Sequence, residues 1–115
     1  MLCLRDEATT PIGSLDYRQV HYGPPGGSSA FEIGIELLLE QRGKGYGSEA
    51  QASLTAYLFA VFPVARVQAS TDLENVAEQR ALEKAGFTRE GALRRAQWRM
   101  GAHHDLVMYS KLRGE

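Results

Sequence analysis

Apolar and polar residues alternate in several short runs of the chain. In residues 31–39 every odd position is apolar, while Glu32, Gly34 and Glu36 fall between the apolar residues. Successive side chains of a β-strand point to opposite faces, so this run predicts a strand with one core face and one polar face. Comparable runs bounded by turn residues predict further strands over residues 2–5, 12–22, 64–70, 88–97 and 104–112.

Two other stretches have the three- and four-residue spacing of a helix. The first has apolar residues on one face, and it predicts a helix that ends near Phe62 and Pro63; these residues are Tyr46, Ala50, Leu54, Tyr57, Leu58 and Val61. The second is expected to begin at Thr71, because Thr71 and Glu74 have the spacing of a capping box. Gly86 is expected to end it in the left-handed conformation, with Phe87 as the apolar contact that follows.

The predicted element order is β-β-β-α-β-α-β-β. This order indicates an α/β (α+β) fold with a mixed sheet and helices packed against it. A length of 115 residues suits a single domain over residues 1–115. With 43% hydrophobic and 23% charged residues, the composition is that of a globular protein and not of a disordered one.

Charge and cysteine content bear on partners and location. The formal net charge of -1 gives no general reason to expect a nucleic acid or an anionic membrane as partner. The run of Arg94, Arg95, Trp98 and Arg99 could suggest a nucleic-acid surface, but a solvated strand face explains it more simply. A single cysteine, Cys3, favours a reducing compartment. The absence of a signal peptide or membrane-length apolar run makes a cytoplasmic location the expectation.

No metal site is expected. His103 and His104 are neighbours on a predicted strand, so their side chains point to opposite faces and cannot readily bind one ion together.

The most informative segment is the glycine-rich turn between the third strand and the first helix. Its glycines, Gly43, Gly45 and Gly47, let the backbone approach a bulky anion. The free N–H groups at a helix start carry partial positive charge, and Arg42 and Lys44 add more, so the turn suits a diphosphate.

Three kinds of phosphate-binding turn can be compared with this segment. The spacing of a Walker A loop is not met. The pattern Gly45-x-Gly47-x-x-Ala50 matches a dinucleotide-binding fingerprint, with Asp72 as the ribose partner. However, a hairpin and a third strand precede the turn, where that fold has the opening strand of a βαβ unit.

The third possibility is a family resemblance. Arg42-x-x-Gly45-x-Gly47 resembles the Arg/Gln-x-x-Gly-x-Gly/Ala motif of GNAT acetyltransferases, and residues 32–34 and 43–50 look like the RimJ/RimL branch of that family. Glu74-Asn75 and residues 81–87 are similar to the second helix and exit strand of that branch, and residues 105–112 resemble its last strand. The three blocks follow one another in the family's order.

The resemblance implies an N-acetyltransferase that moves an acetyl group from acetyl-CoA to a primary amine, either a protein N-terminus or a small amine. The residues that it assigns to coenzyme binding are Leu37, Arg42, Gly43, Lys44, Gly45, Tyr46, Gly47, Ser48 and Asn75. The acceptor must lose a proton, because amines have pKa values of about 8 to 10.4. Glu32, the first choice, and Glu36 lie on the polar face of the strand beside the thioester and are the candidate bases.

The chain departs from the family pattern in two respects. Many relatives have a tyrosine where this chain has Leu82, and the RimL-like branch often has a serine where it has Glu78, so neither usual proton donor is present. The match also begins at the second strand of the family fold. A second subunit is therefore expected to complete the acceptor pocket in a homodimer. The alternative is a non-catalytic CoA- or nucleotide-binding module that has lost its acceptor pocket.

Overall fold

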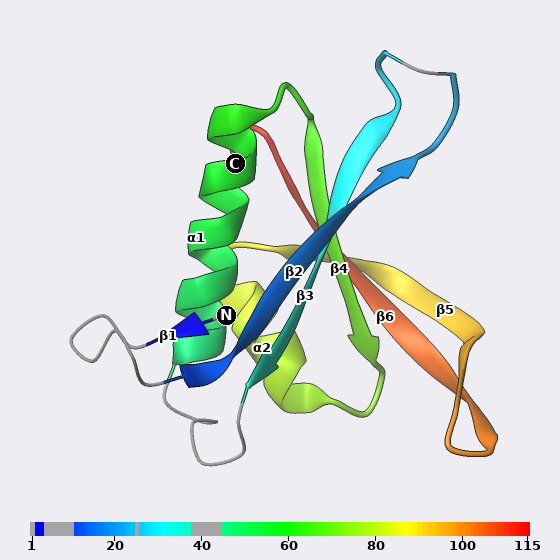
Figure 1. Ribbon diagram of the computed structural model, residues 1–115. Coiled ribbons are helices and arrows are strands. Elements are labelled where there is room, and N and C mark those ends of the chain that lie inside the picture. Colours follow the sequence, from blue (N-terminus) through cyan, green and yellow to red (C-terminus); the bar gives the residue numbers. More distant parts are fainter. Residues whose placement is uncertain (1, 4–10, 25, 38–44) are drawn as a thin grey trace.

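The computed structural model describes residues 2–3, 11–24, 26–37 and 45–115, which form a six-stranded sheet and two helices (Figure 1). The strands are β1 (Leu2–Cys3), β2 (Pro11–His21), β3 (Ser29–Leu37), β4 (Arg66–Asp72), β5 (Thr88–Arg99) and β6 (Ala102–Leu112), and the helices are α1 (Tyr46–Val61) and α2 (Val76–Lys84). The strands lie in the order β1-β2-β3-β4-β6-β5. The predicted element order and fold class are confirmed.

The strands β3 and β4 separate soon after they pair. They form the parallel ladder of the sheet, and its two pairs are Phe31 with Val67 and Glu32 with Gln68. Beyond these pairs each strand continues without the other, and Figure 1 shows their arrowheads well apart. We call the opening between residues 33–37 and residues 69–72 the split. The other ladders of the described residues are antiparallel.

Both helices cover the same face of the sheet. Side chains from β3, β4, β6, α1, α2 and the segments next to these elements form one buried cluster, which consists of Phe31, Ile33, Leu58, Val64, Val67, Ala69, Leu82, Ala85, Phe87, Val107 and Tyr109. The residues between them in β3 and β4, such as Glu32 and Gln68, therefore belong to the opposite, helix-free face.

The start of α2 differs from the sequence-based expectation. Thr71 belongs to β4, where it pairs with Val107, so it cannot cap a helix. The N-cap is Asn75, whose side-chain oxygen accepts a hydrogen bond from the N–H of Glu78 at 3.2 Å. The predicted capping box of Thr71 and Glu74 is wrong because pairing with β6 extends the strand through Thr71.

The end of α2 agrees with the prediction. Gly86 has a φ of 97°, and its N–H donates to the carbonyl of Glu83 at 3.0 Å. The N–H of Phe87 donates to the carbonyl of Leu82, also at 3.0 Å, while both side chains are buried. These two bonds and the apolar contact form a Schellman motif, which confirms Gly86 as the helix stop.

The buried face of α1 is more polar than predicted. Its buried residues include Gln51 and Thr55, whereas Tyr57 and Val61 of the predicted apolar face are about half exposed. The helix packs against α2, and two of its buried polar side chains donate to carbonyl groups of α1 itself. Thr55 Oγ1 donates to the carbonyl of Gln51 at 2.7 Å, and Gln51 Nε2 donates to the carbonyl of Gly47 at 3.0 Å. The predicted face was therefore only partly right.

A row of polar side chains crosses the helix-free face of the sheet. At its centre lies Gln68, which is 1% exposed. Its Nε2 donates to Glu32 Oε1 at 2.8 Å, and its Oε1 accepts from Arg66 Nε at 2.8 Å and from the Tyr22 hydroxyl at 2.9 Å. Arg18 donates to the other oxygen of Glu32 at 2.6 Å. The row thus joins β2, β3 and β4 at the closed end of the split.

The same row continues to the far side of the sheet. The Arg66 guanidinium makes two hydrogen bonds of 2.7 Å to the Glu90 carboxylate, which also accepts from Ser110 Oγ at 2.8 Å. The hydrogen bonds from Arg66 are the main reason why the pKa of Glu90 is lowered to about 2. These contacts connect β4 to β5 and β6.

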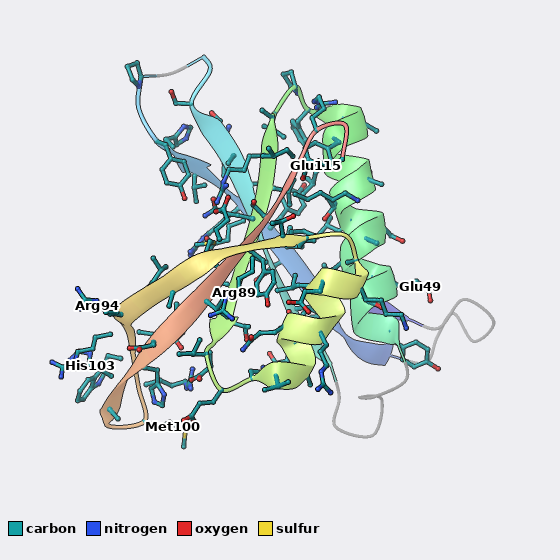
Figure 2. The ribbon with its side chains drawn as sticks, turned by 180° about the vertical axis from the view of Figure 1, so that it is seen from behind. Glu49, Arg89, Arg94, Met100, His103 and Glu115 are labelled. Atoms are coloured by element: carbon teal, nitrogen blue, oxygen red, sulfur yellow. The ribbon has the colours of Figure 1, made fainter. Side chains whose placement is uncertain are left out.

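The strands β5 and β6 form a long hairpin that extends away from α1. Figure 2 shows Arg94, Met100 and His103 projecting near its end. The turn at Met100 and Gly101 has positive φ angles of 51° and 81°, as two-residue hairpin turns require. The backbone N–H of Arg95 donates to the Asp105 carboxylate at 2.8 Å and so connects the two strands near the irregular part of their ladder.

Replacing Gln68 with leucine is expected to lower the free energy of unfolding by about 1–3 kcal/mol, because its hydrogen-bonding partners lose a buried amide. Chemical denaturation of Gln68→Leu measures this change. Gln19→Leu on the exposed surface of β2 is the matched control and is expected to change stability by less than about 0.5 kcal/mol. Equal effects of the two substitutions would contradict the structural role of the Gln68 amide.

Candidate functional site

A cavity of about 580 Å³ opens at the split. Residues 33–36 of β3 and Ser70 and Thr71 of β4 line it from the sheet, and the start of α1 and one side of α2 line it from the helical layer. We call it the main cavity. Its walls thus come from the two separating strands and from the two helices that follow them in the chain.

The start of α1 presents backbone donors at this cavity. Gly45 is the N-cap with a φ of 82°, and the helical hydrogen bonds begin with the N–H of Glu49 donating to the Gly45 carbonyl at 3.2 Å. The N–H groups of residues 46–48 precede that bond and have no acceptor among the described residues. Together with the helix dipole, they form a site suited to an anion.

The structure brings together part of the predicted coenzyme site. Gly45, Gly47, Ser48 and Asn75 all line the main cavity. Tyr46 lies in the first turn of α1 and is half-buried, and Leu37 is the last residue of β3. The remaining predicted residues, Arg42, Gly43 and Lys44, lie outside the described residues.

Two cationic side chains of the main cavity were missed by the sequence analysis. Arg80 and Lys84 both line it from α2. They are four residues apart, so they lie on the same side of the helix. Only this spacing could have indicated them, because nothing in the sequence says which side of α2 faces the split. They add positive charge to the cavity that the α1 amides face.

An acidic side chain also lines the main cavity. Glu78, on α2, accepts a hydrogen bond from Gln51 Nε2 at 3.2 Å and is half-buried. Burial raises the pKa of Glu78 to about 7, and the hydrogen bond from Gln51 only partly offsets that effect. The cavity therefore holds a carboxyl group that titrates near neutral pH.

The two candidate bases line different cavities. Glu36 is exposed and lines the main cavity. Glu32 lines a smaller cavity of about 250 Å³, to which β2 also contributes. The small and main cavities share Ile33, Gly34 and Ser70, so they adjoin at the split. Glu32 belongs to the last pair of the β3–β4 ladder and therefore lies where the split begins.

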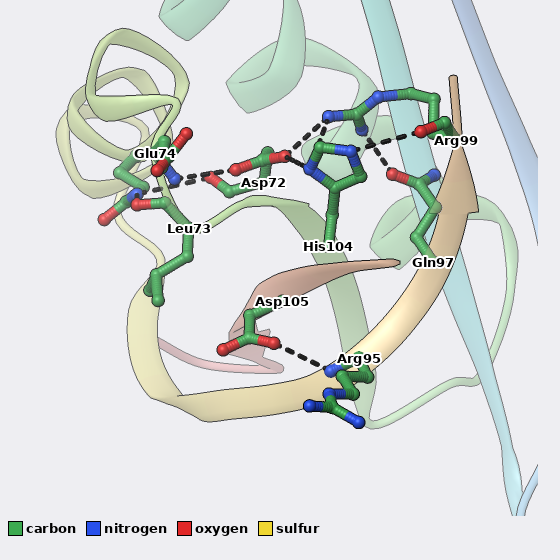
Figure 3. A network of polar contacts seen from close by, with 9 residues as sticks. Asp72, Leu73, Glu74, Arg95, Gln97, Arg99, His104 and Asp105 are labelled. Atoms are coloured by element: carbon green, nitrogen blue, oxygen red, sulfur yellow. Dashed lines mark hydrogen bonds and ion pairs between the residues drawn. The ribbon is translucent and has the colours of Figure 1, made fainter. Parts of the chain in front are cut away.

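A third cavity, of about 520 Å³, lies between the end of β4 and the β5–β6 hairpin. Figure 3 shows the polar network at its wall. The Asp72 carboxylate accepts from Arg99 at 2.6 Å and from the N–H of Glu74 at 2.8 Å, and it lies 3.1 Å from His104 Nδ1. The Glu74 N–H, and after it Arg99, lower the pKa of Asp72. The network fixes the hairpin beside the start of α2.

This network also bears on the dinucleotide hypothesis. That hypothesis needs the Asp72 carboxylate for a ribose, whereas the carboxylate is already bonded to Arg99 and to the backbone of Glu74. The mostly antiparallel sheet also differs from the parallel sheet of dinucleotide-binding folds. The structure does not support dinucleotide binding.

All three cavities meet at Ser70. The sequence analysis expected only a strand over residues 64–70, and alternation places Ser70 on the same face as Gln68. Its position beside the split depends on where the β3–β4 ladder stops, which the sequence does not reveal. Ser70 therefore marks the place where the main cavity adjoins the two cavities on the helix-free face of the sheet.

Neither a metal centre nor a membrane span is found in the described part of the chain. No group of three or more His, Cys, Asp or Glu side chains there could hold a metal ion. None of the described helices is sufficiently long and apolar to cross a membrane.

Comparison with known proteins gives consistent results. Residues 1–88 match the family model of the acetyltransferase (GNAT) domain. The chain is 36% identical over 84 residues to the putative ribosomal N-acetyltransferase YdaF of Bacillus subtilis, a match that covers 73% of this chain and 46% of YdaF. The chain spans about half the length of the curated relatives that it matches.

Solved structures show the same fold. A GNAT-family acetyltransferase from Bacillus anthracis superposes with a TM-score of 0.78 at 26% identity, over 92% of this chain and 61% of that one. The ribosomal L7/L12 α-N-protein acetyltransferase RimL, in complex with coenzyme A, gives 0.68 at 25% identity, over 72% of this chain and 47% of that one. The family match, the curated relatives and the shared fold show that this chain belongs to the GNAT acetyltransferase family.

Proposed function

We propose that this chain transfers an acetyl group from acetyl-CoA to a primary amine, either a protein N-terminus or a small amine. The observation that carries the proposal is the main cavity, which combines a gap between two strands with the N-terminus of α1. One related structure, RimL, holds coenzyme A. An anion-binding helix start beside an open strand edge suits a coenzyme with a diphosphate and a long amide-containing arm.

The described residues fit such a coenzyme. The N–H groups of residues 46–48 would bind the diphosphate, and Arg80 and Lys84 would add positive charge. Past Glu32, the edge of β3 that faces β4 makes no ladder bonds in the described residues. Its backbone N–H and C=O groups would bond the amides of an extended arm, much as a sheet edge binds an added strand. When bound, acetyl-CoA supplies the activated acetyl group.

We assign the role of general base to Glu32. A bound amine with a pKa of about 8 to 10.4 arrives mostly protonated, so a group that accepts its proton speeds attack on the thioester. Glu32 lies where the split begins and lines a cavity that adjoins the main one. Arg18 and Gln68 hold its carboxylate in place. Glu36 lies four residues further along β3 and is the second candidate.

The acceptor amine would approach from the helix-free face. The small and third cavities both reach Ser70, so an amine in either one comes next to the split. Asp16 and Glu32 line the small cavity, and Asp72 and Glu74 line the third. Arg18 also lines the small cavity and Arg99 the third, so each cavity has two carboxylates and one arginine. The excess of carboxylates favours a cationic acceptor by long-range attraction.

We also propose that the protein is a cytoplasmic homodimer. Tyr57 and Val61 of α1 are each 52% exposed, and apolar surface of this kind is more stable when a second subunit covers it. Gel filtration at low protein concentration tests this, and a strict monomer would contradict the dimer.

The direct test of the proposed reaction is thiol release from acetyl-CoA in the presence of small polyamines and N-terminal peptides. Release that depends on one class of amine, together with mass-spectrometric detection of the acetylated amine, is the expected result. If coenzyme A binds but no amine raises thiol release above background, the chain is a binding module and the proposal fails.

The proposed contact of Asn75 with the coenzyme can be tested separately from its role as the N-cap of α2. Asn75→Ser keeps a good N-cap, so its melting temperature is expected to stay close to that of the wild type. Loss of one hydrogen bond to the coenzyme is expected to raise the Kd for coenzyme A about fivefold, as measured by titration calorimetry. An unchanged Kd would mean that Asn75 serves only to start α2.

Removal of the proposed base is expected to give a pH-dependent defect. Glu32→Gln keeps an acceptor for Arg18 and is expected to lower kcat/KM about 100-fold near pH 7. The defect should shrink as pH approaches the pKa of the acceptor, because the free amine is then abundant. Glu36→Gln is the comparison variant, and a larger, pH-dependent loss there would transfer the role of base to Glu36.

A further inference from the structure

A buried amide in α1 has an unsatisfied oxygen. Gln51 is 1% exposed, and its Nε2 donates one N–H to the Gly47 carbonyl at 3.0 Å and the other to Glu78 Oε1 at 3.2 Å. Its Oε1 is also buried but has no hydrogen-bond donor among the described residues. A buried acceptor without a donor destabilises the folded state, so a donor for this atom is expected nearby.

A protonated Glu78 can supply that donor. An ionised carboxylate only accepts hydrogen bonds, whereas a carboxylic acid has one O–H to donate. A carboxylic acid and a primary amide can pair at two points, the amide N–H donating to one carboxyl oxygen and the O–H of the other donating to the amide oxygen. The first of these bonds, from Gln51 Nε2 to Glu78 Oε1, is present at 3.2 Å.

The surroundings of Glu78 also favour its protonated form. Desolvation raises the pKa of this carboxyl to about 7. The charged groups that line the main cavity with it are Arg80 and Lys84 of α2, which favour the carboxylate, and Glu36 of β3, which favours the acid. The walls from α1 and β4 contribute the uncharged Ser48, Ser70 and Thr71. The unsatisfied oxygen of Gln51 and the burial of Glu78 thus both favour the protonated form of Glu78.

We propose that Glu78 and Gln51 form a proton-holding pair in the main cavity and that Glu78 gives this proton to the sulfur of coenzyme A as the thioester bond breaks. The inference rests on the proposed acetyl transfer. The amine nitrogen first bonds to the acetyl carbon, and the C–S bond then breaks with its electron pair moving to sulfur. At the same time the O–H bond of Glu78 breaks and an S–H bond forms. Glu78 remains as a carboxylate, and the proton lost by the amine passes to Glu32, the proposed base, and from Glu32 to solvent.

The pair also explains how the donor is restored. A thiol has a pKa of about 8.5, higher than that of Glu78, so the proton moves to sulfur with a favourable free energy. The resulting carboxylate leaves Gln51 Oε1 without a donor again. The protein therefore favours uptake of a new proton from solvent before the next turnover.

The proton-holding pair is tested first without coenzyme. Infrared spectra or carbon NMR of labelled glutamate side chains, recorded against pH, are expected to show one carboxyl that titrates near 7 in the wild type. Glu78→Gln should lack it. Glu83→Gln, on the same helix but outside the lining of the main cavity, is the matched control and should retain it. A wild type without such a carboxyl, or a Glu78→Gln variant that retains it, would overturn the proposal.

Thermal unfolding gives a second readout that needs no turnover. The pKa of Glu78 is raised from 4.5 to about 7 in the folded protein, so between these values the folded state binds more protons than the unfolded state. Its contribution to stability is therefore lost as pH rises through this range. From pH 5 to 8 the melting temperature is expected to fall more in the wild type and Glu83→Gln than in Glu78→Gln. Equal falls would contradict a raised pKa.

The transfer step is tested by turnover. Glu78→Gln is expected to lower kcat about 10- to 100-fold and to remove the decline of kcat that follows loss of the Glu78 proton at higher pH, whereas Glu83→Gln keeps both. An active wild type with an equally active Glu78→Gln variant would overturn proton donation alone. If the wild type acetylates no amine, both the proposed function and the transfer step fail. The titration without coenzyme still decides separately whether Glu78 holds a proton near pH 7.

Discussion

The hydrogen bond between the Gln68 amide and the Glu32 carboxylate, 2.8 Å long, lies at the last pair of the β3–β4 ladder. It joins the two strands immediately before they part. Glu32, the proposed base, lies at this point, and the main cavity opens beyond it, where the described parts of β3 and β4 no longer pair with each other. A buried amide with three partners is costly to displace, so it fixes where the split starts.

The arrangement of charge around the split is also explained by the fold. The helix dipole of α1 and the side chains of Arg80 and Lys84 favour anions on the helical side. On the helix-free side, Glu32 and Asp72 are paired with Arg18 and Arg99. Carboxylates still outnumber arginines in the lining of both cavities there, and this excess favours cations. In the reaction that we propose, a sheet with helices on one face only would separate an anionic coenzyme from a cationic acceptor, and the two would react at the split.

Much of the fold could be predicted from the sequence, because it depends on local patterns: strand alternation, helical spacing and a helix stop such as Gly86. Interactions between distant segments were harder to predict. Thr71 has the form of a cap, but pairing with β6 keeps it in a strand. Gln51 is polar, yet it is buried against α2. Glu32 and Glu36 share a strand but line different cavities, since the ladder to β4 stops at Glu32.

In our proposal, coenzyme A occupies the split with its diphosphate at the start of α1. Amide hydrogen exchange with and without coenzyme A measures this directly. We expect slower exchange at residues 46–48 and along residues 33–37 and 69–72 when the coenzyme is bound. Saturating coenzyme A that leaves these amides unchanged, or protects a different part of the sheet, would contradict it.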